Sequence, residues 1–190
     1  MPSNKSAGRN NTSAAALVQL VRRDWQNQVC ETYLPRICES LKTLSEDDIW
    51  WRPNPASNSI GNMVLHLCGN VRQWIISGLG GAKDLRQRDL EFSETGPLPS
   101  SDLTRKLQST VNEAARVIAK LTPAAFMRRY QIQGYQVTGY EAANHVAIHF
   151  ALHAGQVIYV AKMKAAKDLG FTHLPSAPLP ADEAKPSRRK

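Results

Sequence analysis

Four segments of this 190-residue chain have the length and the apolar periodicity of amphipathic helices. Connections that contain Pro, Gly and Ser separate them, and no convincing pair of strands lies between them. The segments cover residues 14–44, 60–79, 102–121 and 138–169. Helices of this length bury their apolar faces most simply against one another. We therefore predict an all-α fold, an antiparallel four-helix bundle.

Residues that start, stop or bend helices set the expected boundaries. The cluster Ser57-Asn58-Ser59 can cap the second segment, and Thr138 and Glu141 form a capping box at the start of the fourth. We expect Gly170 to end that helix. Pro35 lies inside the first segment, so we expect a kink there or two consecutive pieces. The stretch RRYQIQGYQV, rich in β-formers, predicts a loop or a small hairpin.

The chain length suits one domain with its own core. We place this domain at residues 14–170, between a disordered N-terminal tail, 1–13, and a flexible basic Pro-rich tail, 171–190. No apolar run reaches the roughly 18 residues that span a bilayer, and the N-terminus lacks the pattern of a signal peptide. We therefore expect a cytoplasmic protein that does not bind membranes.

The charge distribution and the cysteines argue against two further classes of protein, nucleic-acid-binding proteins and disulfide-rich or zinc-ribbon proteins. Half of the net charge of +8 lies in the two tails, and the other basic residues occur as scattered pairs. This distribution does not predict specific nucleic-acid binding. The three cysteines, Cys30, Cys38 and Cys68, form no C-x-x-C pair, so we expect buried reduced thiols.

The fourth segment is apolar on most sides between Tyr140 and Met163, and we expect it to be the most buried helix. Its polar exceptions share one arc of about 80°. They are His145, His149, His153 and Gln156. The opposite stripe should pack into the core. It contains Tyr140, Ala143, Ala147, Phe150, Ala154, Val157 and Ala161.

The second segment has a similar polar arc around His66. Asn62, Asn70, Gln73 and Ser77 fall within about 40° of this histidine on either side. Neither arc contains a charged residue, whereas a solvent-facing stripe usually carries Lys and Glu. The two arcs therefore favour a polar cavity between the helices.

His149 and His153 are spaced i, i+4, which places two imidazoles within reach of one metal ion. A third ligand must come from another helix, and His66 is the only histidine of the second segment. The spacing alone leaves open whether the cluster is a metal site or a polar pocket. We assign His145 to a supporting or pocket-lining position, while Cys68 points to nearly the opposite side from His66.

Two motifs resemble the DinB/YfiT-like superfamily. The segment NHVAIHFALHAGQVIYV resembles the H-x-x-x-H-x-x-x-H-x-G-Q signature of its last helix. The segment WWRPNPASNSIGNMVLHLCGNVRQWI resembles its second-helix region, where a Trp-x-Pro loop leads to a Ser-Ile-Gly helix start and a single histidine. The order of the two motifs along the chain and the distance between them also agree with the superfamily pattern. Ala154 stands where Arg often lies, which puts in doubt any anion contact that this Arg makes in relatives.

The resemblance implies a four-helix bundle with a long crossover connection and a divalent metal site at His66, His149 and His153. Zinc or nickel is the expected ion, with iron or manganese as alternatives. Characterised relatives include thiol transferases that use bacillithiol, mycothiol or glutathione, and a mycothiol-dependent isomerase. Homodimers also occur in such a family, so a homodimer is expected here.

Three neutral imidazoles leave a divalent ion with an open position, as in catalytic sites. The function that we predict is a metal-dependent S-transferase acting on a small-molecule thiol and an electrophile. A metal-dependent hydrolase, or a non-catalytic metal-binding sensor, is the alternative. Gln156, Asn70 and Asn62 are candidates for orienting the ligands or binding substrate.

Overall fold

The computed structural model describes residues 5–171, with side chains from Ser13 onward, and is mostly helical. Its long helical parts are α1 (Lys5–Trp25), η1 (Gln26–Tyr33), α2 (Leu34–Thr43), α4 (Ile60–Val71), η2 (Arg72–Leu79), α6 (Ser100–Lys120) and α8 (Gly139–Ala165). The short helices are α3 (Glu46–Trp50), α5 (Arg88–Ser93) and α7 (Pro123–Met127). The mostly helical prediction is confirmed.

A small two-stranded sheet departs from the all-α prediction. Strands β1 (Arg129–Ile132) and β2 (Tyr135–Thr138) form an antiparallel hairpin in which Ile132 pairs with Tyr135. Gln133 and Gly134 both have positive φ, which a two-residue hairpin turn requires. The sequence left this stretch open between a loop and a hairpin, and tertiary packing of Ile132 against η2 selects the hairpin.

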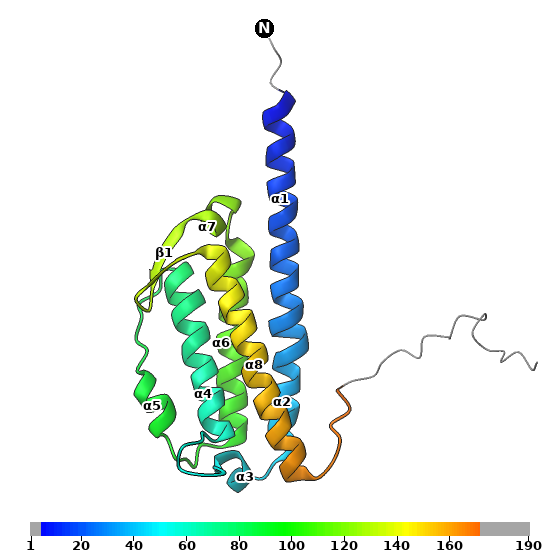
Figure 1. Cartoon of the computed structure of the whole chain (residues 1–190), viewed down its shortest axis with the longest axis vertical. Helices are drawn as coiled ribbons and strands as arrows, with labels where there is room; N and C mark the ends of the chain where they lie inside the picture. The colour runs from blue at the N-terminus through cyan, green and yellow to red at the C-terminus, as the bar shows by residue number, and fades with distance from the viewer. Residues whose placement is uncertain (1–4, 172–190) are drawn as a thin grey trace, which may run out of the picture.

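The first long helix passes through Pro35 by changing its hydrogen-bond pattern. Helices α1, η1 and α2 follow one another without a gap and form one rod in Figure 1. In η1 the bonds reach one residue further back, and the N–H of Leu34 donates to the carbonyl of Val29. A π-type segment therefore leads directly into the proline, where an ordinary α-helix would lose a bond and meet a clash.

The boundaries of the long helices agree with the sequence pattern at most ends. Helix α1 begins at Lys5, however, nine residues before the predicted start near residue 14. Helix α8 ends at Ala165 with Ala166 in the left-handed conformation, so Gly170 is not its stop signal. The predicted C-terminal tail lies outside the described residues apart from Phe171.

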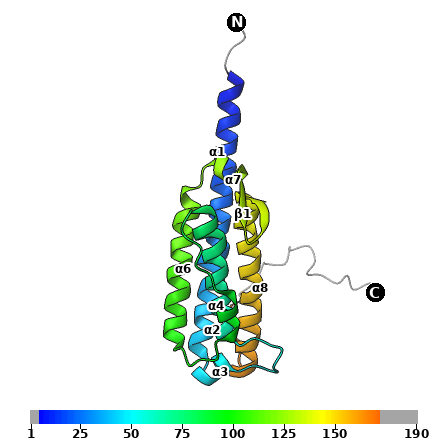
Figure 2. The ribbon, with the colours of Figure 1, turned by 90° about the vertical axis from the view of Figure 1, so that its left-hand side faces the viewer.

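The long helices pack side by side around one apolar core, as Figures 1 and 2 show. Both α2 and α4 contact both α6 and α8. Fully buried side chains from all of these helices meet in this core, among them Ile37, Leu67, Leu107 and Phe150. This arrangement brings α4 and α8, which carry the predicted polar arcs, into direct contact.

The most buried helix is α4, not α8 as the sequence predicted. Eleven of the twelve residues of α4 are buried. Helix α8 buries one apolar face but exposes another, and Tyr140, expected in the core stripe, is 49% exposed. By length and composition alone α8 is apolar enough to cross a membrane, a test that a core helix of a soluble protein also passes.

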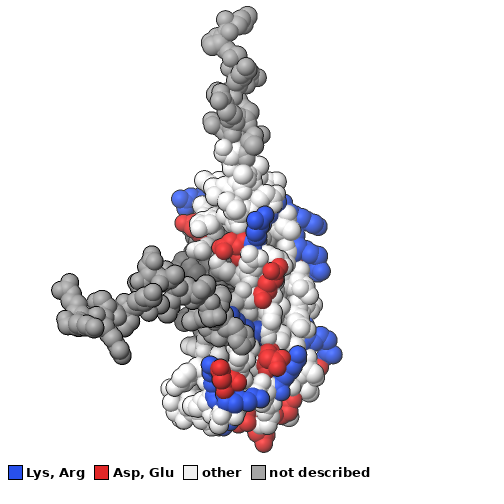
Figure 3. Space-filling view, turned by 90° about the vertical axis from the view of Figure 1, so that its right-hand side faces the viewer, with Lys and Arg blue, Asp and Glu red and all other residues white. Residues whose placement is uncertain are grey.

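Surface charges of both signs are interspersed on the face drawn in Figure 3. Several of the exposed charged residues form ion pairs, including Lys42 with Glu39 and Arg72 with Glu113. Exposed pairs of this kind contribute little to stability.

Capping boxes start both site-bearing helices. Thr138 and Glu141 cap α8 as predicted, and Ser59 caps α4 together with Asn62. Asn62 does more than cap, because its side chain is fully buried, accepts from Arg52 and donates to the backbone carbonyls of Glu91 and Glu94. It thereby ties the connection that carries α5 to the start of α4.

Replacing the two capping side chains should have unequal effects. Thr138→Ala removes an exposed cap and should lower the free energy of unfolding by about 1 kcal/mol. Asn62→Ala leaves several buried groups without partners and should lower it by about 2–3 kcal/mol. Urea denaturation followed by circular dichroism measures both. Equal losses would contradict the anchoring role of Asn62.

Candidate metal centre

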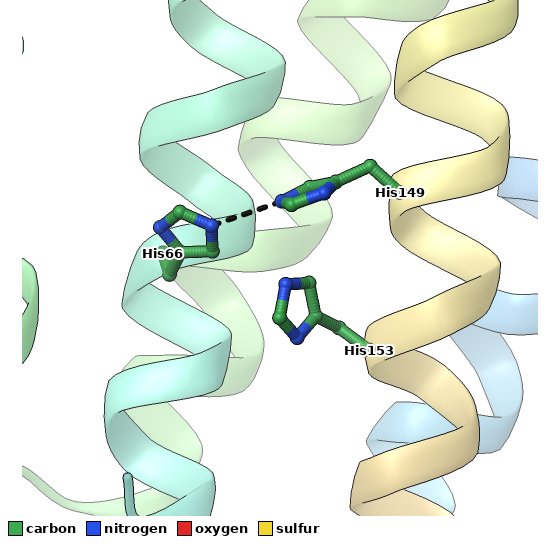
Figure 4. Close-up of side chains that lie close together, drawn as sticks. All are labelled: His66, His149 and His153. Atoms are coloured by element: carbon green, nitrogen blue, oxygen red, sulfur yellow. Dashed lines mark hydrogen bonds between the residues drawn. The ribbon is translucent and has the colours of Figure 1, made fainter.

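His66, His149 and His153 converge between α4 and α8. One ring nitrogen from each histidine lies within 4.8 Å of the others. The Nε2 atoms of His66 and His149 are 2.9 Å apart, and the ring centroids of His66 and His153 are 5.1 Å apart. Figure 4 shows His66 reaching from α4 toward the two imidazoles of α8. The structure thus brings together the three residues that the sequence selected.

A buried carboxylate orients His66. Nδ1 of His66 lies 2.9 Å from Oε2 of Glu91, and both residues are buried. Nη2 of Arg86 also lies 3.1 Å from this nitrogen, but it donates to Oε2 of Glu91 at the shorter distance of 2.8 Å. A carboxylate oxygen can only accept, so the closer contact to Glu91 assigns the proton to Nδ1, which donates it. The lone pair of Nε2 then faces His149 and His153. Hydrogen bonding of the distal nitrogen to a carboxylate is how proteins commonly set the tautomer of a metal-ligating histidine.

Arg86 neutralises this carboxylate. Its Nε and Nη2 donate to the two oxygens of Glu91 at 2.7 and 2.8 Å, a bidentate pair with Arg86 almost fully buried. Burial alone would raise the pKa of the Glu91 carboxyl, but the hydrogen bonds from Arg86 and His66 outweigh it and hold this pKa below its usual range. Glu91 therefore stays ionised next to His66.

The sequence patterns did not indicate a role for Arg86 or Glu91. Both lie in the long connection after the second helix, which showed no pattern of its own. Their position depends on a close approach to α4, where a Cβ on Gly69 would lie 1.8 Å from Oε1 of Glu91. A glycine in the middle of a helix is the one local signal that something packs against it there.

Gln156 orients His153 from the same helix. Its Oε1 lies 2.7 Å from Nδ1 of His153, so the ring donates through Nδ1 and presents Nε2. Burial lowers the pKa of His153, while this hydrogen bond acts in the opposite direction. The expectation that Gln156 supports a ligand agrees with this contact.

His145 and Asn70 stand beside the three histidines. His145 stacks on Trp74 with ring centroids 3.9 Å apart, and on His149 at 5.5 Å. The amide nitrogen of Asn70 lies 3.4 Å from Nε2 of His145, while Oδ1 of Asn70 is buried and has no partner among the described residues. Both residues line the neighbourhood of the cluster.

The structure also shows the surroundings of Asn62 and Cys68. The hydrogen bonds of Asn62 described above serve the start of α4 and the α5 connection. Its place in the first turn of α4 directs its side chain toward the connection, and a pocket-lining role for Asn62 stays a prediction. Cys68 is buried near Thr110 of α6, consistent with its predicted direction away from His66.

The electrostatics keep His149 neutral. Burial is the main cause that lowers its pKa, and repulsion from His153, His66, His145 and Arg86 lowers it further, to about 3. Burial and Arg86 also lower the pKa of His145. Neutral imidazole is the form that binds a metal ion.

The donor set fits a divalent transition-metal ion. Metal–nitrogen bonds of about 2.0–2.1 Å in a tetrahedral site separate the nitrogens by about 3.3 Å. The observed separations, 2.9 Å for one pair and up to 4.8 Å for the set, bracket this value. Small side-chain rotations therefore suffice to form a three-imidazole site.

Comparisons with known proteins agree with the fold. The crystal structure of the DinB-like protein YjoA from Bacillus subtilis matches with a TM-score of 0.56 and 16% sequence identity. The match covers 82% of this chain and 96% of that chain. No curated protein matches the sequence. The fold and the two motifs thus place the chain in the DinB/YfiT-like superfamily.

Within it, the chain belongs to the family described as "Protein of unknown function (DUF1572)", whose model matches residues 21–177.

Without metal, stability should depend on the protonation of His149. Between pH about 5 and 6.5 the unfolded chain binds a proton at this histidine and the native chain does not. Stability is therefore greatest above pH 6.5 and falls as the pH drops, by less than about 1.4 kcal/mol per pH unit. Urea denaturation in the presence of a chelator should show this slope for the wild type and a shallower one for His149→Gln. If the wild type and His149→Gln lost stability equally with falling pH, His149 would not be the group that causes the dependence.

Proposed function

We propose that this protein is a divalent-metal-dependent enzyme that transfers a small-molecule thiol to an electrophile. The proposed site lies within the DinB-like helical fold, at His66, His149 and His153. The observation that carries the proposal is the convergence of these imidazoles from two helices, with the outer nitrogens of His66 and His153 engaged by Glu91 and Gln156. Nothing in this arrangement supplies a fourth protein ligand among the described residues, so one position is free for a reactant.

Zinc or nickel suits three neutral imidazoles best, and both accept nitrogen ligands at this spacing. When bound, such an ion supplies a Lewis acid that lowers the pKa of a thiol or a water molecule at its free position.

The protein's own residues hold the geometry. Glu91 and Arg86 lock the ring of His66 in one tautomer, and Phe92 of α5 packs against that ring with centroids 4.8 Å apart. The rings of Trp74, His145 and His149 form a continuous stack beside the cluster, which holds His149 in place.

Metal binding should follow the ligand assignment. Alanine at position 66, 149 or 153 should sharply reduce zinc and nickel affinity, measured by titration against a competing chelator. Glu91→Gln keeps the shape but weakens the acceptor for His66, and should cost about 10- to 100-fold in affinity. His145→Ala should retain the ion. If His145→Ala loses the ion while His66→Ala keeps it, the assignment is wrong.

A matched pair of glycine variants tests the position of Glu91 in the same titration. Gly69→Ala forces the Glu91 carboxylate away, so it should weaken metal binding as Glu91→Gln does. In Gly155→Ala the new methyl group meets no atom within 4 Å, so the metal affinity should equal that of the wild type.

Activity should require both metal and thiol. The zinc- or nickel-loaded protein should conjugate chlorodinitrobenzene or an epoxide with at least one of glutathione, bacillithiol and mycothiol, followed by loss of free thiol. The variant with all three histidines changed to alanine serves as the control. Equal rates for wild type and this variant with every thiol would sink the transferase proposal. Metal-dependent cleavage of an ester without thiol would favour a hydrolase instead.

A further inference from the structure

A cavity of about 570 Å³ lies between α4, α6 and the connection that carries α5. Figures 1 and 2 show α5 on the outer side of α4. Cys68, which points away from His66, belongs to the cavity wall, and the three site histidines are not among the described residues that line it. Small-molecule sites commonly have volumes of about 300–1,000 Å³. The cavity is therefore large enough to bind a small molecule, and it is separate from the candidate metal centre.

Leucines of the α5 connection supply the apolar part of the lining. Leu85, Leu90 and Leu98 all border the cavity and are 65%, 61% and 36% exposed. They do not belong to the buried core, whereas Leu65 of α4 adds a buried apolar side chain to the same wall. Exposed apolar side chains that gather around a concave site are typical of a binding surface.

Three cations line the cavity, and two of them have a carboxylate partner. Arg86 pairs with Glu91, and Arg72 pairs with Glu113 at 3.1 Å. The third cation is Lys106 of α6, which forms no ion pair of 4 Å or less with the residues that the structure describes. An unpaired ammonium group beside an apolar cavity attracts an anion.

The charge of Lys106 acts at the inner wall of the cavity. Burial raises the pKa of the Cys68 thiol to about 12, and the positive charge of Lys106 opposes this rise, so the ammonium lies near the buried thiol. The remaining carboxylate of the lining, Glu94, accepts from two backbone N–H groups of its own turn. Ser109 lies three residues after Lys106 on the same face of α6 and adds a hydroxyl donor.

We propose that this cavity binds an amphipathic carboxylate, an aliphatic chain of medium length that ends in one carboxyl group. The chain lies against Leu85, Leu90 and Leu98, and the carboxylate meets Lys106. A single negative charge matches the single unpaired cation, whereas a dianionic head group would bring a second charge toward the glutamates of the lining. The proposal does not depend on whether the histidine cluster binds metal or is catalytic.

Equilibrium dialysis of the full-length protein against labelled hexanoate, octanoate and decanoate tests the site. A chelator is present so that no metal ion can hold the carboxylate. The dissociation constant should fall with chain length, by up to about fourfold for each added CH₂ group. Decanol has the same chain without the charge and should bind at least about tenfold more weakly than decanoate.

A pair of lysine variants tests the contact with the carboxylate. Lys106→Gln should raise the dissociation constant of decanoate at least about tenfold and leave that of decanol unchanged. The control Lys120→Gln removes the same charge from an exposed position of α6 outside the cavity lining, and should change neither constant.

A pair of leucine variants tests the contact with the chain. Leu90→Gln should weaken the binding of decanoate and of decanol, each at least about threefold. The control Leu17→Gln changes a leucine of α1 that is also 61% exposed and lies outside the cavity lining, so both constants should stay as in the wild type. Circular dichroism checks that all four variants are folded.

Several outcomes would overturn the proposal. A wild type that does not bind decanoate, or that binds it no more tightly than hexanoate, would do so. Equal effects of the two lysine variants, or of the two leucine variants, would also do so, because the ligand would then bind elsewhere. Co-sedimentation with phosphatidylcholine vesicles without binding of free decanoate would show that the leucines contact a lipid surface instead.

Discussion

The buried carboxylate of Glu91 is the constraint on which the candidate site depends. An ionised carboxylate inside a protein is costly unless its charge and its lone pairs are satisfied. Here Arg86 supplies the charge and two hydrogen bonds, and His66 supplies a third. Meeting this requirement holds the connection against α4 and fixes the ring of His66, so one interaction stabilises the loop and aims the ligand.

Helix α8 has three different faces: one packs into the core, one carries the histidines, and one is exposed and apolar. Two of the three faces are therefore apolar, which explains why its sequence is apolar on nearly every side. Its alanines, Phe150 and Val157 pack into the core. Its histidines face α4, and a third face exposes Ile148, Leu152, Tyr159 and Met163. Uniform apolarity predicts burial on all sides, but it is equally compatible with a helix that leaves one apolar face exposed.

Two π-type segments interrupt the regular α-helices, one directly before a proline and one beside the histidine cluster. Segment η1 carries the first helix into Pro35, and η2 continues the helix of His66 toward Trp74, whose ring stacks on His145. Such π-type turns are found frequently at functional sites. The hairpin adds to this region, because Gln133 accepts from the indole of Trp74.

The sequence alone determined the long helices, most of their ends and the three histidines, because these are local properties. Periodicity, capping residues and i, i+4 spacing act over a few residues and can be counted along the chain. It did not determine the roles of Arg86, Glu91 and Asn62, nor which apolar face of α8 is exposed. Glu91 lies 25 residues from His66 in the chain. Only the packing of the α5 connection on α4 brings the two together, since an irregular connection has no period from which its contacts can be read.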